Sequence, residues 1–225
     1  MFIVLEGLDG AGKSTQIKYL QDFILANGKK SQMIHFPRFD APLYGQLIAK
    51  FLRGELGAVD QVSPHLVALL YAGDRQHAAP QIRGWLANGH VVIADRYVYS
   101  NIAYQCAKIE DREKQMELRN WILQMEYNYF NLPRPHLNLF LDVPLGFVSQ
   151  KLNTQRDGED RAYLEGKLDI HESNLNFQEK VRQVYLDQAG IDHRFEVISC
   201  GDRSGAMLQE QQIATLICEK LTKKL

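Results

Sequence analysis

Five short apolar segments recur along the chain, and longer stretches with helical periodicity separate them. Each segment holds few polar residues, which is typical of strands that are buried on both faces of a parallel sheet. The segments are residues 2–5, 33–36, 91–94, 137–143 and 195–199. This pattern predicts a parallel sheet of five strands.

Apolar residues at intervals of three and four predict helices between these strands. The first helix carries Ile17, Leu20 and Ile24 on one face and ends at Asn27-Gly28, a pair that favours a helix C-terminus. Further helices are expected at residues 44–51, 63–88, 98–105, 112–129, 145–152, 173–188 and 207–221. Because strands alternate with helices throughout, the sequence predicts an α/β fold with helices on both faces of the sheet.

Length and composition fit one α/β domain over residues 1–225. The formal net charge of −1 argues against nucleic acid and membrane surfaces as partners, since both favour a basic excess. The three cysteines have no metal-ligand spacing, and no apolar run approaches membrane-spanning length. With no visible targeting signal, we expect a cytoplasmic protein with reduced thiols.

A glycine-rich loop follows the first strand directly. Gly7, Gly12, Lys13 and Ser14 satisfy the pattern G-x-x-x-x-G-K-[ST] between a strand and a helix, which is the context that a phosphate-binding loop requires. Its glycines bring backbone N–H groups close to phosphate oxygens, and the helix adds the positive end of its dipole. We expect Lys13 to reach the β- and γ-phosphates and the Ser14 hydroxyl to ligate Mg²⁺. The predicted ATP site comprises Gly7, Leu8, Asp9, Gly10, Ala11, Gly12, Lys13, Ser14 and Thr15.

Charged residues follow the second and third strands. Asp95 ends the third strand, where a carboxylate is expected to hold Mg²⁺ or its waters, and Arg96 beside it could bridge charge on two phosphates. Arg38 follows the second strand. Ligands of open α/β sheets bind beyond the carboxyl ends of strands, so Arg38 either meets an anion there or is a solvated surface charge.

Two helices carry polar and aromatic residues with two interpretations each. Tyr71 and Arg75 lie four residues apart on one helical face, which fits either packing with a surface charge or a platform for a nucleobase. Asn101, Tyr104 and Gln105 form either a solvated helix face or a polar surface over a ligand.

The arginines favour one class of reaction. Arg156 and Arg161 bracket the segment QRDGEDR, which is either a solvated loop or a mobile lid over phosphates. A hydroxyl acceptor would require a general base, whereas a phosphate acceptor is already ionised and requires cations that bring two anions into line. A switch GTPase is disfavoured because the guanine-reading N-K-x-D stretch is absent. The residues therefore favour a nucleoside monophosphate kinase.

Five motifs strengthen this interpretation. In their order and spacing, FIVLEGLDGAGKSTQ, FPRF, LLYAGDR, DRYVYSNIAYQ and LFLDVP resemble thymidylate kinase across roughly residues 2–165. The resemblance implies a P-loop fold with a short lid at about 153–165, and transfer of the ATP γ-phosphoryl group to dTMP with Mg²⁺, giving dTDP for dTTP biosynthesis. It also implies a homodimer, with the helix around Trp121 or the long helix before Asn88 as its interface.

The resemblance also implies roles for individual residues. Catalysis would involve Lys13, Asp9, Arg96, Arg38 and a lid arginine. Some family members carry an arginine in the loop where this chain has Gly10, so the chain is similar to the bacterial form, in which Arg156 or Arg161 would supply that charge. The metal would be held by Ser14, Asp95 and Asp9, with Glu165 as a further candidate.

For dTMP, the family pattern places Asp9 near the sugar and phosphate. Arg38 and Arg96 would clamp the phosphate, and Tyr71 would stack on thymine. The remaining dTMP-binding positions are Arg75 and Asn101, which would read the polar edge of the base, Tyr104, which would crowd the 2′ position and select deoxyribose, and its neighbour Gln105.

Two rival functions stay open. A deoxynucleoside kinase phosphorylates a 5′-hydroxyl and, as that family is known, uses the carboxylate of a Glu-Arg pair as base where this chain has Asp95-Arg96. A non-catalytic nucleotide-binding regulator would bind ATP without phosphorylating an acceptor.

Overall fold

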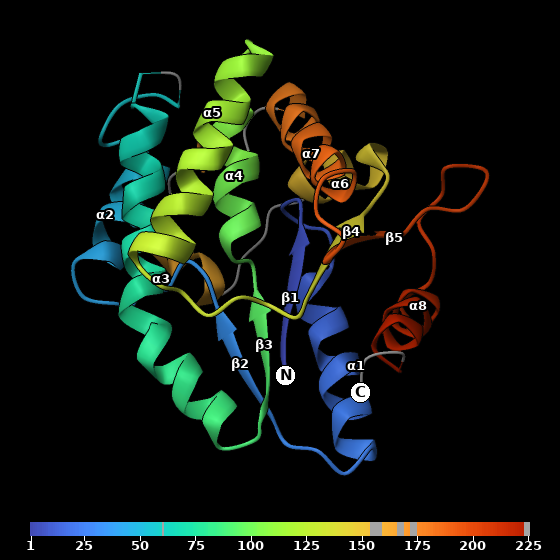
Figure 1. The fold of residues 1–225 in the computed structure, drawn as a ribbon. Helices are drawn as coiled ribbons and strands as arrows, with labels where there is room; N and C mark the ends of the chain where they lie inside the picture. Colours follow the sequence, from blue (N-terminus) through green and yellow to red (C-terminus); the bar gives the residue numbers. More distant parts are fainter. Residues whose placement is uncertain (60, 154–158, 166–168, 172–174, 223–225) are drawn as a thin grey trace.

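The five predicted strands form one parallel sheet in the order β2-β3-β1-β4-β5 (Figure 1). The computed structural model describes residues 1–59, 61–153, 159–165, 169–171 and 175–222. The strands are β1 (Phe2–Gly7), β2 (Ser31–His35), β3 (Val91–Asp95), β4 (Leu137–Asp142) and β5 (Phe195–Ser199). The predicted sheet is therefore confirmed, including its parallel pairing.

Helices cover the sheet in two groups. Helices α1 and α8 pack against each other, whereas α4 contacts α3, α5 and α7; Figure 1 shows the two groups on opposite sides of the sheet. This arrangement confirms the predicted α/β fold. The helices are α1 (Lys13–Ala26), α2 (Tyr44–Leu52), α3 (Pro64–Ala87), α4 (Val98–Cys106), α5 (Arg112–Leu123), α6 (Leu145–Asn153), α7 (Leu175–Ala189) and α8 (Glu210–Thr222), with a 3₁₀ turn η2 (Glu159–Leu164).

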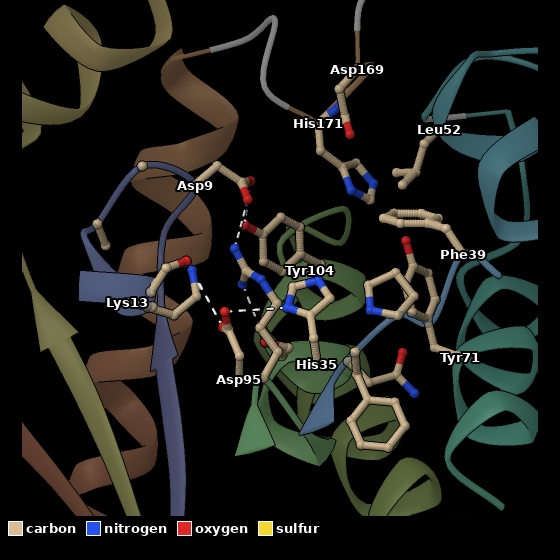
Figure 2. A pocket seen from close by; sticks show the side chains of 18 of the residues that line it. Asp9, Lys13, His35, Phe39, Leu52, Tyr71, Asp95, Tyr104, Asp169 and His171 are labelled. Atoms are coloured by element: carbon tan, nitrogen blue, oxygen red, sulfur yellow. Dashed lines mark hydrogen bonds and ion pairs between the residues drawn. The ribbon is translucent and has the colours of Figure 1, made fainter. Parts of the chain in front are cut away.

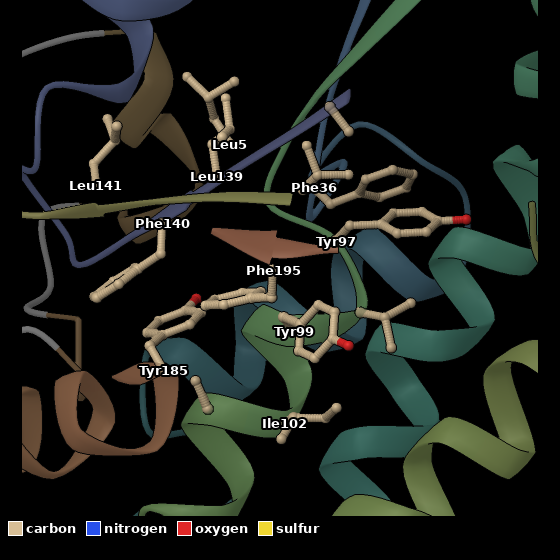
Figure 3. Packing of buried hydrophobic residues seen from close by; sticks show 14 of the residues in the cluster. Leu5, Phe36, Tyr97, Tyr99, Ile102, Leu139, Phe140, Leu141, Tyr185 and Phe195 are labelled. Atoms are coloured by element: carbon tan, nitrogen blue, oxygen red, sulfur yellow. The ribbon is translucent and has the colours of Figure 1, made fainter. Parts of the chain in front are cut away.

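The central strands are mainly apolar because both of their faces are covered. Every residue of β1 and β3 is buried, whereas the edge strand β2 buries Ile34 alone. Beneath β4, the rings of Phe140, Tyr185 and Phe195 stack in one layer (Figure 3). Each such side chain contributes about 1.5–3 kcal/mol through burial, so these layers hold the carboxyl ends of the strands in place.

The predicted helix over residues 112–129 is interrupted. Helix α5 ends at Leu123, and the chain continues as a π-helix, η1 (Gln124–Tyr129). After this wider turn, Phe130 and Leu132 donate backbone hydrogen bonds to the carbonyls of Met125 and Glu126 at 2.8 and 3.0 Å. Glu126 lies inside this turn and is fully buried, an arrangement that a 3.6-residue period does not encode.

The carboxyl ends of the strands meet at one edge of the sheet. His35 and Leu5 are both in register with Asp95, so the ends of β2, β1 and β3 lie side by side. The chain order also reverses here, because β1 lies between β3 and β4. In open α/β sheets, ligands bind at such a reversal.

Candidate active site

The glycine loop turns as its sequence predicts. Gly10 and Gly12 have φ angles of 77° and 79°, in the left-handed region where a side chain would be strained. Helix α1 begins directly afterwards, so its free N–H groups face the loop. Lys13 folds back over the loop, and its Nζ donates a hydrogen bond to the Leu8 carbonyl at 3.2 Å.

A cavity of about 420 Å³ opens beside this loop at the carboxyl edge of the sheet (Figure 2). Residues 9–15 of the loop line it together with seven other predicted site residues, which are Tyr71, Arg75, Asp95, Arg96, Asn101, Tyr104 and Gln105. The structure thus brings the predicted phosphate loop and most of the predicted acceptor residues around one space.

Asp9, Arg96 and Tyr104 form a linked group in the cavity wall. Arg96 Nη2 donates to Asp9 Oδ1 at 2.6 Å, and the Tyr104 hydroxyl donates to Asp9 Oδ2 at 2.7 Å. Burial alone would raise the pKa of Asp9, but the Arg96 guanidinium and the Lys13 ammonium outweigh it and hold that pKa well below its usual range. Asp9 is therefore ionised, and both of its oxygens are occupied by donors.

Glu6 is linked to Arg96 through the Ser100 hydroxyl. This carboxylate is fully buried and accepts hydrogen bonds from the backbone N–H of Tyr97 at 3.0 Å, the Tyr185 hydroxyl at 3.0 Å and Ser100 Oγ at 2.5 Å. Ser100 Oγ in turn accepts from Arg96 Nη1 at 3.3 Å. The sequence interpretation missed Glu6, although an acid inside an otherwise apolar strand is a signal that could have identified it.

Arg75 reaches the cavity from α3 as half of a buried ion pair. Its Nε and Nη2 donate to the two carboxylate oxygens of Glu126 at 2.5 and 2.7 Å, and only 2% of Arg75 is exposed. Asn101 Nδ2 donates to the same carboxylate at 2.9 Å. Asn101 Oδ1 is buried without a hydrogen-bond partner in the described part of the chain. Glu126 was not foreseen, because no local pattern distinguishes it from a surface acid.

Arg38 points elsewhere. Its Nε donates to Asp74 Oδ1 and its backbone N–H to Asp74 Oδ2, both at 2.9 Å, and a further guanidinium contact reaches His77. Arg38 is not among the residues that line the cavity. Its role as a clamp on a phosphate stays a prediction.

The lid residues are described only in part. Arg156 and the side chain of Arg161 lie outside the described residues. Glu165 is two-thirds exposed, and its Oε1 lies 3.0 Å from Arg53 Nη1 instead of lining the cavity. Next to it, Tyr163 stacks face to face on Phe39, with ring centroids 3.6 Å apart. Both rings line the cavity, and neither was predicted.

His171 closes the cavity on the side away from Asp95 (Figure 2). The rings of Tyr104, Phe51 and Phe177 surround it, with centroids 5.1–5.4 Å away. Burial lowers the pKa of His171 to about 3, and the Lys108 ammonium adds to this effect. The imidazole is therefore neutral at physiological pH.

This burial predicts a loss of stability in mild acid. Between pH 3 and 6.5 the unfolded chain binds a proton at His171 that the folded protein excludes, so the free energy of unfolding falls as the pH falls. From pH 7 to pH 5 this single group accounts for about 2 kcal/mol. Urea unfolding at both pH values should show this loss in the natural protein and a smaller loss in His171→Phe. Equal losses in the two proteins would contradict the assignment.

Two side chains with oxygen atoms suited to Mg²⁺ line the cavity, one on the loop side and one at the end of β3. Asp95 Oδ1 is buried, has no hydrogen-bond partner in the described residues and lies 3.9 Å from Lys13 Nζ. Ser14 is exposed and lines the same cavity. No cluster of three or more His, Cys, Asp or Glu side chains that could hold a metal occurs in the described residues. A hydroxyl and one carboxylate nevertheless fit Mg²⁺, which takes few protein ligands and completes its shell with phosphates and waters.

Strand order, loop and cavity together define the class: a P-loop nucleotide-binding protein whose loop joins the first strand of a parallel sheet to a helix. Within that class, the sequence profile described as thymidylate kinase matches residues 5–210. The chain belongs to the thymidylate kinase family.

Individual relatives agree with this assignment. The chain is 36% identical over 201 residues to the probable thymidylate kinase of Pyrococcus horikoshii, which covers 88% of this chain and 87% of that protein. It is 31% identical over 192 residues to the thymidylate kinase of Mycobacterium tuberculosis, with 84% and 86% covered. The solved structure of Candida albicans thymidylate kinase superposes with a TM-score of 0.71 at 27% identity, over 99% of this chain and 91% of that chain. The resemblance inferred from the motifs is confirmed.

Proposed function

We propose that this protein transfers the γ-phosphoryl group of ATP to dTMP, giving ADP and dTDP for dTTP synthesis. The observation that carries the proposal is the joining of two compartments in one cavity. One compartment is the phosphate loop with Lys13. The other is lined by Tyr71, Arg75 and Asn101. Arg96 also lines the cavity, and its guanidinium contacts Asp9 of the loop.

The acidity of the site favours a phosphate acceptor over a hydroxyl. Burial would raise the pKa of Asp95, but the Lys13 ammonium and the hydrogen bond from His35 hold that pKa below its usual value. Asp9 is held low in the same way by Arg96 and Lys13. Carboxylates of such low basicity are poor general bases near neutral pH. An ionised phosphate acceptor needs no base and instead uses the positive charge of Arg96 and Lys13 for alignment.

The second compartment suits thymine. Asn101 Oδ1 is free to accept a hydrogen bond from the N3–H group, and Arg75 has further N–H groups that can donate to O4. Tyr71 offers a ring for stacking. The Tyr104 hydroxyl, held by Asp9, would occupy the space beside the sugar and disfavour a 2′-hydroxyl.

Mg²⁺ would be held by Ser14 and Asp95 and would neutralise charge on the β- and γ-phosphates. A direct role for Asp9 is less favoured, because Arg96 and Tyr104 occupy both of its oxygens. Residues 153–165 would act as a lid of this single domain, with Arg156 or Arg161 supplying charge to the phosphates. No helix in the described ranges is long and apolar enough to cross a membrane, and we propose a cytoplasmic location.

A homodimer is also proposed. Leu66, Leu69 and Trp121 leave 61%, 44% and 37% of their surface exposed on α3 and α5, and Tyr129 on η1 is 83% exposed. Leu69, Trp121 and Tyr129 line one apolar hollow. Exposed apolar groups gathered in this way mark an interaction surface, and light scattering should give twice the monomer mass. A Leu69→Glu variant should give the monomer mass.

A substrate panel tests the reaction. ADP release from ATP and Mg²⁺ should be measured with dTMP, other nucleoside monophosphates and thymidine, and dTMP should give the highest kcat/KM. Turnover of thymidine but not dTMP would indicate a deoxynucleoside kinase. ATP binding without dTMP-dependent ADP release would indicate a regulator.

A further inference from the structure

His35 lies at the carboxyl end of β2, directly in register with Asp95 on β3. Its Nδ1 lies 3.2 Å from Asp95 Oδ2 (Figure 2). The imidazole is 46% exposed and lines the same cavity as the phosphate loop. No family motif quoted above includes it, and the proposed reaction gives it no role.

The two oxygens of Asp95 have different surroundings. His35 holds Oδ2, whereas Oδ1 has no hydrogen-bond partner in the described residues. Only 5% of the Asp95 side chain is exposed. Lys13 Nζ is 3.9 Å from Oδ1, beyond hydrogen-bond distance. A buried carboxylate oxygen without a donor is costly unless a ligand or water completes it.

Rotation of the carboxylate would remove this cost. An Asp95 side chain released from His35 could turn toward Lys13 and shorten the 3.9 Å separation to a close ion pair. Such an ion pair would occupy both the Lys13 ammonium, which the phosphates require, and Asp95 Oδ1, which the metal site requires. The contact from His35 opposes this rotation.

We propose that His35 is a positioning residue whose Nδ1–H group holds Asp95 Oδ2, so that Oδ1 stays available to the hydration shell of Mg²⁺ and Lys13 stays available to the triphosphate. This inference rests on one part of the proposed function, which is the binding of Mg²⁺ at Ser14 and Asp95. Partners that orient a metal-binding carboxylate typically change metal affinity by 10–100-fold when removed.

The surroundings of His35 do not fit a purely structural role. β2 is an edge strand held by backbone pairing with β3, and almost half of the imidazole is exposed. Loss of the ring removes little buried apolar surface. His35→Ala should therefore keep its thermal unfolding temperature within about 2 °C of the natural protein.

The test compares His35→Ala with His35→Asn, whose amide N–H can replace the Nδ1–H donor. Calorimetry should measure ATP affinity with and without Mg²⁺, and steady-state assays should measure kcat, KM for dTMP and the half-saturating Mg²⁺ concentration. In His35→Ala we expect about a tenfold weaker gain in ATP affinity from Mg²⁺ and about a tenfold higher Mg²⁺ requirement. KM for dTMP should change less than twofold, and His35→Asn should recover most of the loss.

His193→Ala, at an exposed histidine before β5, is the matched control and should leave the Mg²⁺ dependence unchanged. An unaltered Mg²⁺ dependence in His35→Ala, or a His35→Asn variant as impaired as His35→Ala, would overturn the proposal. The calorimetric arm needs no dTMP, so it still decides the role of His35 if dTMP proves not to be the acceptor.

Discussion

Replacing Lys13 by alanine is expected to lower kcat by about 10²–10³-fold, the usual cost of removing one preorganised donor from a developing negative charge. Lys13 is the loop ammonium, only 9% of its side chain is exposed, and it lies in the cavity wall between Leu8 and Asp95. Coupled assays of ADP release with saturating dTMP measure the effect directly.

The same substitution should not destabilise the fold. Burial and the Arg96 guanidinium lower the pKa of Lys13, which means that the site disfavours the ammonium despite the attraction of Asp95. Because burying the Lys13 ammonium lowers the stability of the fold, its removal should leave the thermal unfolding midpoint unchanged or raise it. Lys18→Ala, on the exposed face of α1, is the matched control and should keep normal kcat. Near-normal kcat in Lys13→Ala would refute the assigned role.

Replacing Arg75 by alanine is expected to lower the free energy of unfolding by about 3–5 kcal/mol, because it leaves the buried Glu126 carboxylate without its partner. For a chain of this size, the thermal midpoint should fall by roughly 6–20 °C. The substitution should also raise KM for dTMP more than KM for ATP, since Arg75 lies in the wall of the second compartment.

A double-mutant cycle separates these effects. Glu126→Ala alone should cost a similar amount, and the double variant should cost clearly less than the sum of the two. Arg83→Ala, at an exposed arginine of the same helix, should have little effect on KM. Additive losses in the cycle would show that the ion pair is not the source of the stability, and an unchanged KM and kcat for dTMP in Arg75→Ala would argue against base recognition.

Much of the site was predictable because its signals are local. The glycine loop is a contiguous motif, and Asp95-Arg96 directly follows an apolar strand, so both are specified by near neighbours in the chain. Parallel strands bring their carboxyl ends to one edge, which places these two segments together without further information.

Other features depend on partners that are distant in sequence. Glu126 pairs with Arg75 across 51 positions, and it enters the core through a π-helix that helical periodicity does not reveal. Asp74 holds Arg38 across 36 positions, so this arginine does not line the cavity, whereas the family resemblance implies that it clamps the acceptor phosphate. In each case an acid that looks like surface charge in the sequence is placed by packing.

The sequence by itself determined the α/β fold, the parallel sheet and the phosphate loop, because period, apolar runs and glycines act over a few residues. Only the tertiary structure decided which carboxylate holds each arginine, and that His35 meets Asp95. The physical reason is that buried charges must be paired, and the partner is the nearest group in space, which neighbouring residues in the chain do not specify.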